Sequence, residues 1–598
     1  MSSMVTPLFA LMLAATTPVI ETKPAVFHSN RPKTAVTQVT PVLGRAAARL
    51  PAEARHDLPA LSAAERARLS SKDARGGLRR KRPAEKVGIE RTLPARVGFA
   101  GLPLDLAAGG ARVASGGDFE RAPDGRLTWT AAFSSEGAGA LRLHIAEASL
   151  PAGSRVYVYS ASGETYGPYT FDRGTRPEGF WTNTIFAPEV FLEVQFPAGA
   201  AAGFGDAWLA VSSIIHLEHP GFAPTAGPGS GAYRTKAQQC FVDAACVTPA
   251  EFPAIEDAKL GVAQLTFVDG GSAFVCTGGL LNSTPETFVP YLLTANHCFS
   301  TQAAATSLES VWQYVRASCN GPEPSPFGFP RTLGSTLRAT GETSDFTLVE
   351  LDEDPPDGSL FFGWTTADVT QNDGTILYRL SCPDGRPQFF TEESITAIPT
   401  PVECFDAPQG PFVYEKDVVG GTGGGSSGSL VYLGSLQVVG QLGGACGNDP
   451  PDDCAVLENS SIDGAFHVSF PSLEPFIAPG GPGACVASPT TLCLNGGRFE
   501  VTVDWATNTG NTGVGQGVPL TSDSGYFWFF NAANIELVVK VLQACSVNQH
   551  FWVFAGGLTN VEVVMTVTDT HTGVQKIYGN PLGTAFVPLQ DTGAFSCP

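Results

Sequence analysis

The sequence predicts a mainly β protein with several domains. Short runs rich in β-branched and aromatic residues alternate with Gly and Pro turns along much of the chain. The central block shows almost no helical periodicity of its apolar residues. A chain of 598 residues is also too long for a single hydrophobic core. Together these observations predict consecutive β domains rather than one unit.

The N-terminal part is predicted to hold a leader, a basic segment and a β domain. Residues 1–23 are typical of a secretory signal peptide, because the short apolar stretch Leu8–Ala15 is followed by small residues. Residues 24–96, rich in Ala, Arg and Pro, predict a basic and largely flexible pro-segment. Residues 97–219 alternate apolar and polar positions, which predicts a β-sandwich pro-domain.

The rest of the chain divides at two breaks rich in Pro and Gly. Residues 220–234 are predicted to be a linker, in which Arg234, together with the following Lys236, offers an exposed cleavage site. Residues 235–480 are strand-like and turn-rich. Residues 481–598 predict a C-terminal β-rich accessory domain.

The distribution of charges and cysteines limits the classes of function that fit this sequence. Residues 1–234 carry 25 Lys and Arg against 20 Asp and Glu, whereas residues 235–480 carry 8 against 30. Such an acidic centre is unlike a nucleic-acid-binding surface. All 13 cysteines follow residue 239, which favours disulfides in an exported protein. No later window has the roughly 20 apolar residues that span a bilayer. We therefore expect a secreted, extracellular monomer without nucleic-acid or membrane partners and without a cofactor.

The stretch GGTGGGSSGSLVYLG at residues 420–434 looks like a flexible linker by composition. Strand-like segments flank it on both sides, however, so it is predicted to be a tight turn inside a domain. A turn that presents a serine nucleophile needs a base, and residues 235–480 contain two histidines, His297 and His467. The alternation around His467 predicts a strand face and a structural role for it.

Three motifs in residues 235–480 resemble those of a known protein family. TANHC, SDFTLVEL and GSSGS are similar to the His, Asp and Ser motifs of chymotrypsin-fold serine endopeptidases, and especially to those of bacterial lysyl endopeptidases. His297, Asp345 and Ser427 follow one another in the order of that fold. The resemblance implies a trypsin-like serine protease domain with a chymotrypsin-like double β-barrel over residues 235–480.

The resemblance also assigns roles to residues. It implies that His297 is the general base, that Asp345 orients it, and that Ser427 is the nucleophile. The backbone N–H groups of Gly425 and Ser427 would form the oxyanion hole. Zinc binding is the weaker alternative, because no pair of short Cys or His knuckles converges.

The same resemblance implies disulfide bridges in the protease domain. The implied pairs are Cys240–Cys446, Cys246–Cys319 and Cys276–Cys298, with Cys382–Cys404 as a possible fourth. Because 13 is odd, one thiol should remain, and Cys454 is the candidate.

The resemblance fails at the specificity pocket. The positions that would carry the substrate-binding anion are Gly421 and Ser461, and Gly443 replaces a histidine of the lysyl enzymes. The pocket is therefore expected to lack an anion, unless Asp463 or Glu458 substitutes through a different loop register. A buried cation without a partner is costly, so a Lys or Arg preference does not follow from these positions.

Two functions from different classes remain open. The first is a secreted serine endopeptidase made as a zymogen, whose partners are protein or peptide substrates and its own pro-region. The second is a noncatalytic surface-binding or adhesion protein with a protease-like domain. The intact set of His297, Asp345 and Ser427 favours the first. Processing near Arg234 is expected to need another protease, since the expected pocket offers no anion for a basic residue.

Overall fold

The computed structural model describes the chain in segments that together cover all three predicted β regions. Among its described residues, no helix is long and apolar enough to cross a membrane. The described residues are 21–27, 50–70, 84–100, 116–121, 126–170, 175–176, 179–197, 207–218, 241–284, 288–396, 412–446, 460–479, 485, 487–570 and 572–597.

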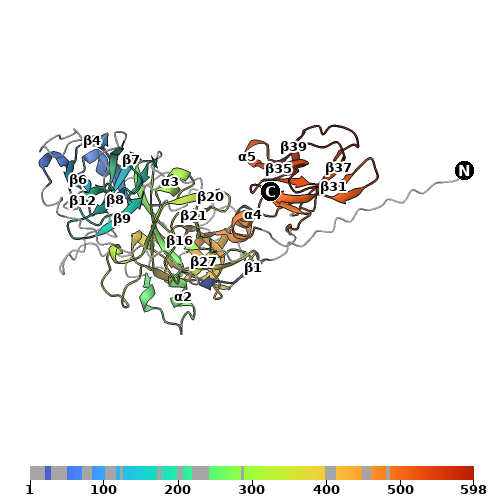
Figure 1. Ribbon diagram of the computed structural model, residues 1–598. Helices are drawn as coiled ribbons and strands as arrows, with labels where there is room; N and C mark the ends of the chain where they lie inside the picture. Colours follow the sequence, from blue (N-terminus) through green and yellow to red (C-terminus); the bar gives the residue numbers. More distant parts are fainter. Residues whose placement is uncertain are drawn as a thin grey trace.

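The N-terminal region is a sandwich of two sheets (Figure 1). Apolar side chains from both sheets, such as Trp129, Leu143 and Leu192, share one core. The first sheet contains β3 (Arg55–Leu58), β5 (Asp118–Arg121), β6 (Leu127–Ser135), β8 (Arg155–Tyr159), β9 (Thr165–Thr170) and β12 (Glu189–Gln195). The second contains β4 (Glu85–Ala100), β7 (Ala140–Ser149), β10 (Thr175–Arg176), β11 (Phe180–Trp181) and β13 (Trp208–Leu217).

Part of the segment expected to be flexible has regular structure. Strand β4 begins at Glu85, twelve residues before the expected start of the sandwich at Val97, and helix α1 (Ala63–Ser70) and the 3₁₀ turn Ala52–Ala54 also lie in this segment. The buried side chains of Val87 and Ile89 explain why the strand starts so early, since both lie on its apolar face. The charged composition of the segment hid this short apolar pattern.

The expected end of the signal peptide at residue 23 falls inside a paired segment. Strand β1 (Thr22–Lys23) pairs with β23 (Gly363–Thr365), and β2 (Val26–Phe27) pairs with β22 (Leu360–Phe361). The side-chain amide of Asn282 donates a hydrogen bond to the carbonyl of Pro24. These contacts place residues 21–27 on the central domain.

The central domain begins with an open half-barrel. Its strands follow one another in the order β19, β18, β15, β16, β17, β21 and β20, and helix α3 (Gln302–Thr306) contributes to its core. The bounds are β15 (Val262–Asp269), β16 (Ser272–Leu280), β17 (Tyr291–Ala295), β18 (Glu309–Trp312), β19 (Arg331–Leu333), β20 (Ser335–Gly341) and β21 (Phe346–Leu351). Before it come β14 (Val242–Asp243), the turn Ala244–Cys246 and α2 (Ile255–Lys259); within it lies the turn Pro326–Gly328.

The second half of the central domain is a closed barrel of six strands. The order β28, β27, β24, β25, β26, β29 closes because β29 pairs with β28. Helix α4 (Phe466–Ile477) follows, and its Phe466 and Phe470 rings pack against Trp364. The bounds are β24 (Ile376–Ser381), β25 (Phe389–Ile395), β26 (Phe412–Val419), β27 (Leu430–Tyr432), β28 (Gln437–Cys446) and β29 (Ser460–Ala465), with a turn at Pro383–Gly385. A half-barrel followed by a closed barrel confirms the predicted double-barrel fold class.

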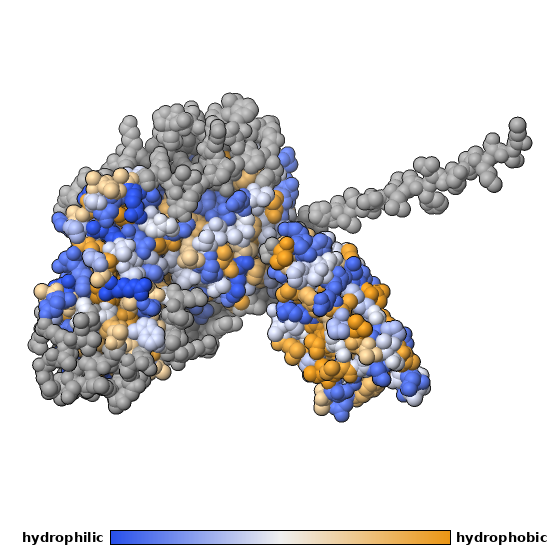
Figure 2. Space-filling view, turned by 90° about the horizontal axis from the view of Figure 1, so that it is seen from above, coloured by the Kyte–Doolittle hydropathy of each residue, from blue (hydrophilic) through white to orange (hydrophobic). Residues whose placement is uncertain are grey.

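The C-terminal region is a third β unit, made of two five-stranded sheets around one core. Disulfides Cys485–Cys493 and Cys545–Cys597 lie within it. Apolar side chains lie exposed on its surface (Figure 2), among them Val547, Leu558 and Val587. Its elements are β30 (Leu492–Leu494), β31 (Phe499–Ala506), β32 (Thr512–Val514), β33 (Gln516–Pro519), β34 (Ser524–Trp528), β35 (Leu537–Ala544), α5 (Cys545–Asn548), β36 (His550–Gly557), β37 (Glu562–Asp569), β38 (Gln575–Asn580) and β39 (Leu589–Ser596).

Candidate active site

The three residues expected to form a triad come from both halves of the central domain. His297 follows β17 and Asp345 precedes β21, and these two strands are paired in the half-barrel. Ser427 lies in the turn before β27 of the closed barrel. The Thr277 N–H of β16 donates to the Ser427 carbonyl at 2.8 Å, which ties the serine turn to the half-barrel. The candidate site therefore lies where the two halves meet.

His297 and Asp345 form a close pair. The His297 backbone N–H donates to Asp345 Oδ1 at 2.9 Å, and His297 Nδ1 lies 2.7 Å from Asp345 Oδ2. Because an ionised carboxylate can only accept, Nδ1 carries the proton in the neutral ring and Nε2 is left with its lone pair. The pair is thus arranged for Nε2 to accept a proton.

The backbone around Asp345 is held in an uncommon conformation. Its φ angle is 54°, in the left-handed region that non-glycine residues seldom adopt. The side-chain amide of Gln441 donates to the carbonyls of Ser344 and Asp345, at 2.7 and 3.3 Å. These contacts from β28 of the closed barrel stabilise the strained turn and so aim the carboxylate at the histidine.

The glycine-rich turn is braced rather than free. Gly425 and Gly428 have φ angles of 84° and 79°, which glycine adopts without a Cβ clash. A Cβ at Gly428 would lie 2.1 Å from Thr294 Oγ1. The hydroxyl of Thr277 donates to the Gly425 carbonyl at 2.9 Å, and the Gly428 N–H donates to Leu442. The Gly- and Ser-rich composition of this segment therefore forms a tight, braced turn and not a flexible linker.

The serine and the histidine are close but not joined. The carbonyl of Ser427 lies 3.7 Å from the sulfur of Cys298, the residue after His297. Among the described residues, His297 Nε2 has no hydrogen-bond partner and is buried. The His297 side chain is 2% exposed and Ser427 is 3% exposed, so both are buried.

A disulfide braces the histidine. Cys276 of β16 is bonded to Cys298, next to His297, and Cys246 is bonded to Cys319. The expected bridge Cys240–Cys446 and the expected free thiol Cys454 lie outside the residues whose side chains the structure describes. Cys382 is a buried free thiol, so the expected Cys382–Cys404 bridge is wrong. Its backbone N–H donates to the Thr277 hydroxyl at 3.0 Å, and the residue is fully buried where the half-barrel meets the closed barrel.

His467 is not part of this site. It lies on helix α4 rather than on the predicted strand face, and its Nε2 is 3.9 Å from Asp368 Oδ1. The buried apolar residues Phe466, Phe470, Leu473 and Ile477 recur at helical spacing, and this period overrides the short local alternation. The structural role expected for His467 agrees with this placement.

Each of the three expected pocket positions has a distinct neighbour. The Gly421 carbonyl accepts a hydrogen bond from Thr391 Oγ1. A Cβ at Gly443 would lie 3.1 Å from Asp345 Oδ2, so this glycine makes room for the carboxylate. The hydroxyl of Ser461 donates to Glu393 Oε1 at 3.1 Å and lies 3.5 Å from Asp417 Oδ1.

A buried acidic cluster therefore stands behind Ser461. Glu393 comes from β25, Glu415 and Asp417 from β26, and Asp463 from β29, and none of the four is more than 3% exposed. The Arg379 guanidinium bonds Glu393 at 2.9 Å, Glu415 at 3.4 Å, and Asp463. Matching the sequence to the pocket positions of lysyl endopeptidases did not reveal this cluster. The signal that could have revealed it is the presence of acidic residues at alternate positions of otherwise apolar strands.

Burial and mutual repulsion make two carboxyl groups of the cluster harder to ionise. Burial, followed by repulsion from Asp463 and Glu393, raises the pKa of Glu415 well above its usual range. Burial also raises the pKa of Asp463 to about 6, although Arg379 opposes this. Oxygens of Glu393, Glu415 and Asp463 lie within 4.8 Å of one another, so these three are the residues that could hold a metal ion. Arg379 already occupies the position of a cation among them.

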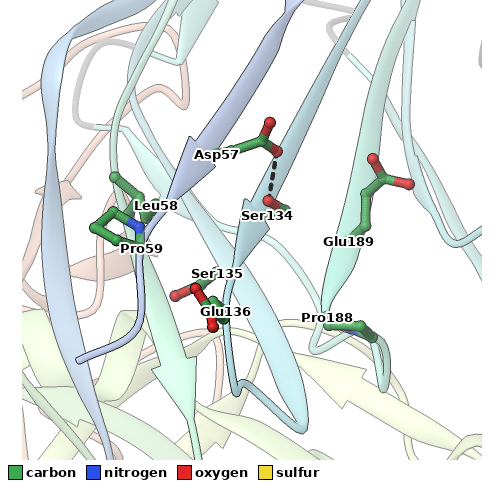
Figure 3. Close-up of a pocket in the computed structure, with 8 residues that line it drawn as sticks. All are labelled: Asp57, Leu58, Pro59, Ser134, Ser135, Glu136, Pro188 and Glu189. Carbon is green, nitrogen blue, oxygen red and sulfur yellow. Dashed lines mark hydrogen bonds between the residues drawn. The ribbon is translucent and has the colours of Figure 1, made fainter.

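A pocket with a volume of about 410 Å³ lies outside the central domain. Figure 3 shows its lining on the N-terminal sandwich, with Asp57 and Ser134 hydrogen-bonded to each other and Glu189 on a neighbouring strand. None of its lining residues belongs to the central domain. It is thus separate from the candidate active site.

A half-barrel and a closed barrel, with a His–Asp pair and a glycine-braced serine where they meet, define the chymotrypsin fold of serine endopeptidases. Residues 235–454 match the family model described as lysyl endopeptidase, C-terminal domain. This central domain is accordingly a chymotrypsin-fold domain related to the lysyl endopeptidases.

One curated relative is the lysyl endopeptidase of Pseudomonas aeruginosa, 28% identical over 293 residues that cover 46% of this chain. The match spans 60% of the length of that relative. Among solved structures, the thermostable serine protease AL20 of an extremophilic microorganism has 13% identity and a TM-score of 0.25, covering 35% of this chain and 92% of that one. The protease Anisep of Arthrobacter nicotinovorans has 16% identity and a TM-score of 0.26, with coverages of 35% and 91%.

Proposed function

We propose that the protein is the precursor of a secreted serine endopeptidase that hydrolyses peptide bonds through an acyl-enzyme. The observation that carries this proposal is the close His297–Asp345 pair beside the braced Ser427 turn. A noncatalytic binding protein would have no need for a strained Asp345 held by Gln441.

The chemistry follows from what each group can do. Nε2 of neutral His297 takes the proton of the Ser427 hydroxyl as Oγ attacks the peptide carbonyl. Asp345 keeps the proton on Nδ1 and stabilises the imidazolium that forms. The protonated Nε2 then gives its proton to the leaving amine, and water repeats the sequence on the acyl-enzyme. No step needs a metal or a cofactor.

The oxyanion hole is assigned to the N–H groups of Gly425 and Ser427. In the described part of the chain, neither N–H donates to another backbone group, and Gly425 has a positive φ angle of 84°. A negative charge that develops on the carbonyl oxygen would meet both donors in a water-poor turn.

A labelling experiment tests the reaction class. After removal of the N-terminal sandwich by an added protease, an organophosphonate is expected to form one covalent adduct, mapped by mass spectrometry to Ser427. Ser435→Ala, on the exposed turn after β27, serves as the control and should label normally. An unlabelled Ser427 would favour the noncatalytic alternative.

The substrate preference is assigned to a basic residue before the cleaved bond. Gly421, Gly443 and Ser461 supply no charge, but Glu393 and Asp417 lie directly behind the Ser461 hydroxyl. Arg379 contacts three buried carboxyl groups, those of Glu393, Glu415 and Asp463, and Asp417 adds a fourth, so acidic groups outnumber the one guanidinium there. The relative named lysyl endopeptidase is consistent with this preference. The pocket would thus obtain its anion from neighbouring strands rather than from the expected positions.

Asp417→Asn tests this assignment. We expect kcat/KM for a substrate with lysine at this position to fall by about 10-fold to 100-fold, which corresponds to losing one partly compensated charge interaction of about 1.5–3 kcal/mol. A substrate with a neutral residue at the same position is the control, and its kcat/KM should change little. Equal losses for both substrates would mean that Asp417 only supports the fold.

The N-terminal sandwich is proposed to be the pro-region of a zymogen. Its support is its contact with the half-barrel, where β4 pairs with β16 and Glu309 accepts hydrogen bonds from Asn183 Nδ2 and Thr184 N. The expected processing sites Arg234 and Lys236 lie outside the described residues. With an anionic pocket, cleavage by the enzyme itself at a basic residue becomes chemically reasonable, in contrast to the expectation from the pocket positions alone.

A further inference from the structure

Residues 21–27 pair with the central domain and lie apart from the N-terminal sandwich (Figure 1). Strand β1 lies antiparallel to β23, and β2 lies antiparallel to β22. The Glu21 backbone N–H donates to Thr366 Oγ1 at 2.7 Å, and the Thr366 N–H donates to the Glu21 carbonyl at 2.9 Å. Because β23 itself pairs with β28, these bonds extend the sheet of the closed barrel. We call residues 21–27 the added strand.

The segment that receives the added strand, residues 360–366, connects the two halves of the central domain. Along the chain the half-barrel ends with β21, and the closed barrel begins with β24. Phe362 forms a bridge with Leu281, directly after β16 of the half-barrel. Gly363 and Trp364, by contrast, pair with β28 of the closed barrel. The added strand therefore lies along the place where the chain passes from one half to the other.

Gly363 shows how closely the added strand fits. A Cβ at this position would lie 2.2 Å from the Lys23 carbonyl oxygen and 2.6 Å from the Ala25 nitrogen. The φ angle of Gly363 lies outside the left-handed region that favours glycine, so the backbone of β23 does not itself need a glycine here. The three atoms nearest to such a Cβ all belong to residues 23–25. A side chain at this position would therefore displace the added strand.

Side chains of the added strand contact cores on both sides of this connection. Ala25 packs against a core cluster whose members include Leu293 of β17 and Tyr432 of β27. That cluster contains apolar residues of both halves. Val26 packs against the core of the half-barrel. The added strand thus joins the two halves through side chains as well as through its backbone.

A further contact links the added strand to the candidate active site. Asn282 follows β16, and its side-chain amide donates to the Pro24 carbonyl at 2.8 Å. Within β16, the Thr277 N–H donates to the Ser427 carbonyl. Strand β16 also pairs with β17, which leads to His297. A shift at this end of β16 would therefore change how His297 and Ser427 face each other.

We propose that residues 360–366 form a strand-binding site for Glu21–Phe27, and that the bound segment holds the two halves in the arrangement that catalysis needs. The added strand then belongs to the protease domain as a positioning element and not to the pro-region. This inference rests on the proposed function. Because His297 and Ser427 come from different halves, a misplacement of about 1 Å can slow the chemical step by about 100-fold. Loss of the added strand should therefore lower kcat more than it changes KM.

Hydrogen–deuterium exchange in the full chain tests the strand-binding site. Gly363→Ala should displace the added strand, so we expect the amides of residues 21–27 to exchange about tenfold faster or more. Ala25→Asp should act from the other side, because it places a carboxylate against an apolar core and leaves the central domain unchanged. Gly328→Ala is the matched control, since a Cβ there meets no atom within 4 Å. Unchanged exchange at residues 21–27 in both variants would overturn the inference.

A rescue experiment tests the positioning role. The wild type, Gly363→Ala and Gly328→Ala are freed of the N-terminal sandwich by the same added protease, repurified and assayed with an excess of a synthetic peptide of residues 21–27. We expect equal kcat for the wild type and Gly328→Ala. For Gly363→Ala we expect kcat to be lower by about tenfold or more, with KM within about twofold. A peptide carrying Ala25→Asp should not raise kcat of the wild type.

Mass spectrometry of the processed wild type shows whether it keeps its own residues 21–27. If they are lost, the added peptide should raise both kcat and the thermal unfolding temperature, and no change in either would overturn the inference. If they are kept, equal kcat in the wild type and Gly363→Ala would overturn it. Both of these results leave the proposed function intact, because Ser427 would still be labelled by the organophosphonate. Failure of the wild-type Ser427 to label with the peptide present would instead refute the proposed function.

Discussion

Ser427→Ala is expected to lower peptide hydrolysis by about 10⁴-fold or more once the N-terminal sandwich has been removed. The variant keeps the turn, because the backbone contacts from Thr277 and Leu442 do not involve the Ser427 side chain. It loses the oxygen that forms the acyl-enzyme. His297→Ala should have an effect of similar size, since the hydroxyl then has no base.

The measurement is the steady-state rate on a peptide substrate, with both proteins processed by the same added protease. Ser435→Ala is the matched control, because it removes the same hydroxyl from a nearby exposed turn. Circular dichroism should show that all variants are folded. Near-normal turnover by Ser427→Ala would exclude the serine mechanism.

Asp345→Asn should also lower turnover by about 10⁴-fold near neutral pH. The reason is a change of tautomer. An asparagine amide that donates toward Nδ1 favours the ring form with the proton on Nε2, which cannot accept a proton from Ser427. The His297 backbone N–H would retain an oxygen acceptor, so the histidine should stay in place.

The rate is measured against pH, because the defect should diminish when a stronger external base replaces the histidine. Glu342→Gln is the matched control, since it removes one negative charge from the exposed turn that precedes Asp345. That variant should keep its activity. An unchanged rate in Asp345→Asn would mean that another group orients His297.

The barrel strands and the site motifs were predictable because they depend on local signals. Alternating β-branched and aromatic residues predicted strands over the central domain, and the structure confirms its fold class. The order of the three motifs identified His297, Asp345 and Ser427 as candidate catalytic residues. The structure brings His297 and Asp345 into contact. The glycines at 425 and 428 predicted a tight turn, and both have positive φ angles.

Errors arose where a residue's role depends on distant partners. Residues 24–96 were expected to be largely flexible, but Glu85–Ala100 form a strand because β13 and β16 supply hydrogen-bond partners from far along the chain. Cys382 was expected in a bridge but is a free thiol. The helical period of residues 466–477 likewise overrode the local alternation around His467.

The sequence by itself determined that the chain is mainly β, that its N-terminal part is basic and its central part acidic, and which residues could carry acyl transfer. These properties depend on composition, hydrophobic period and residue order, which are local to the chain. Only the tertiary structure decided which carboxylates lie beside the Ser461 hydroxyl and which distant segments contact the serine turn. Glu393, Asp417 and Ser461 come from three strands, and Glu85 lies more than 300 residues before the turn that it contacts. Such contacts follow from how strands pair and how their side chains are buried, and neither is encoded in any short stretch of sequence.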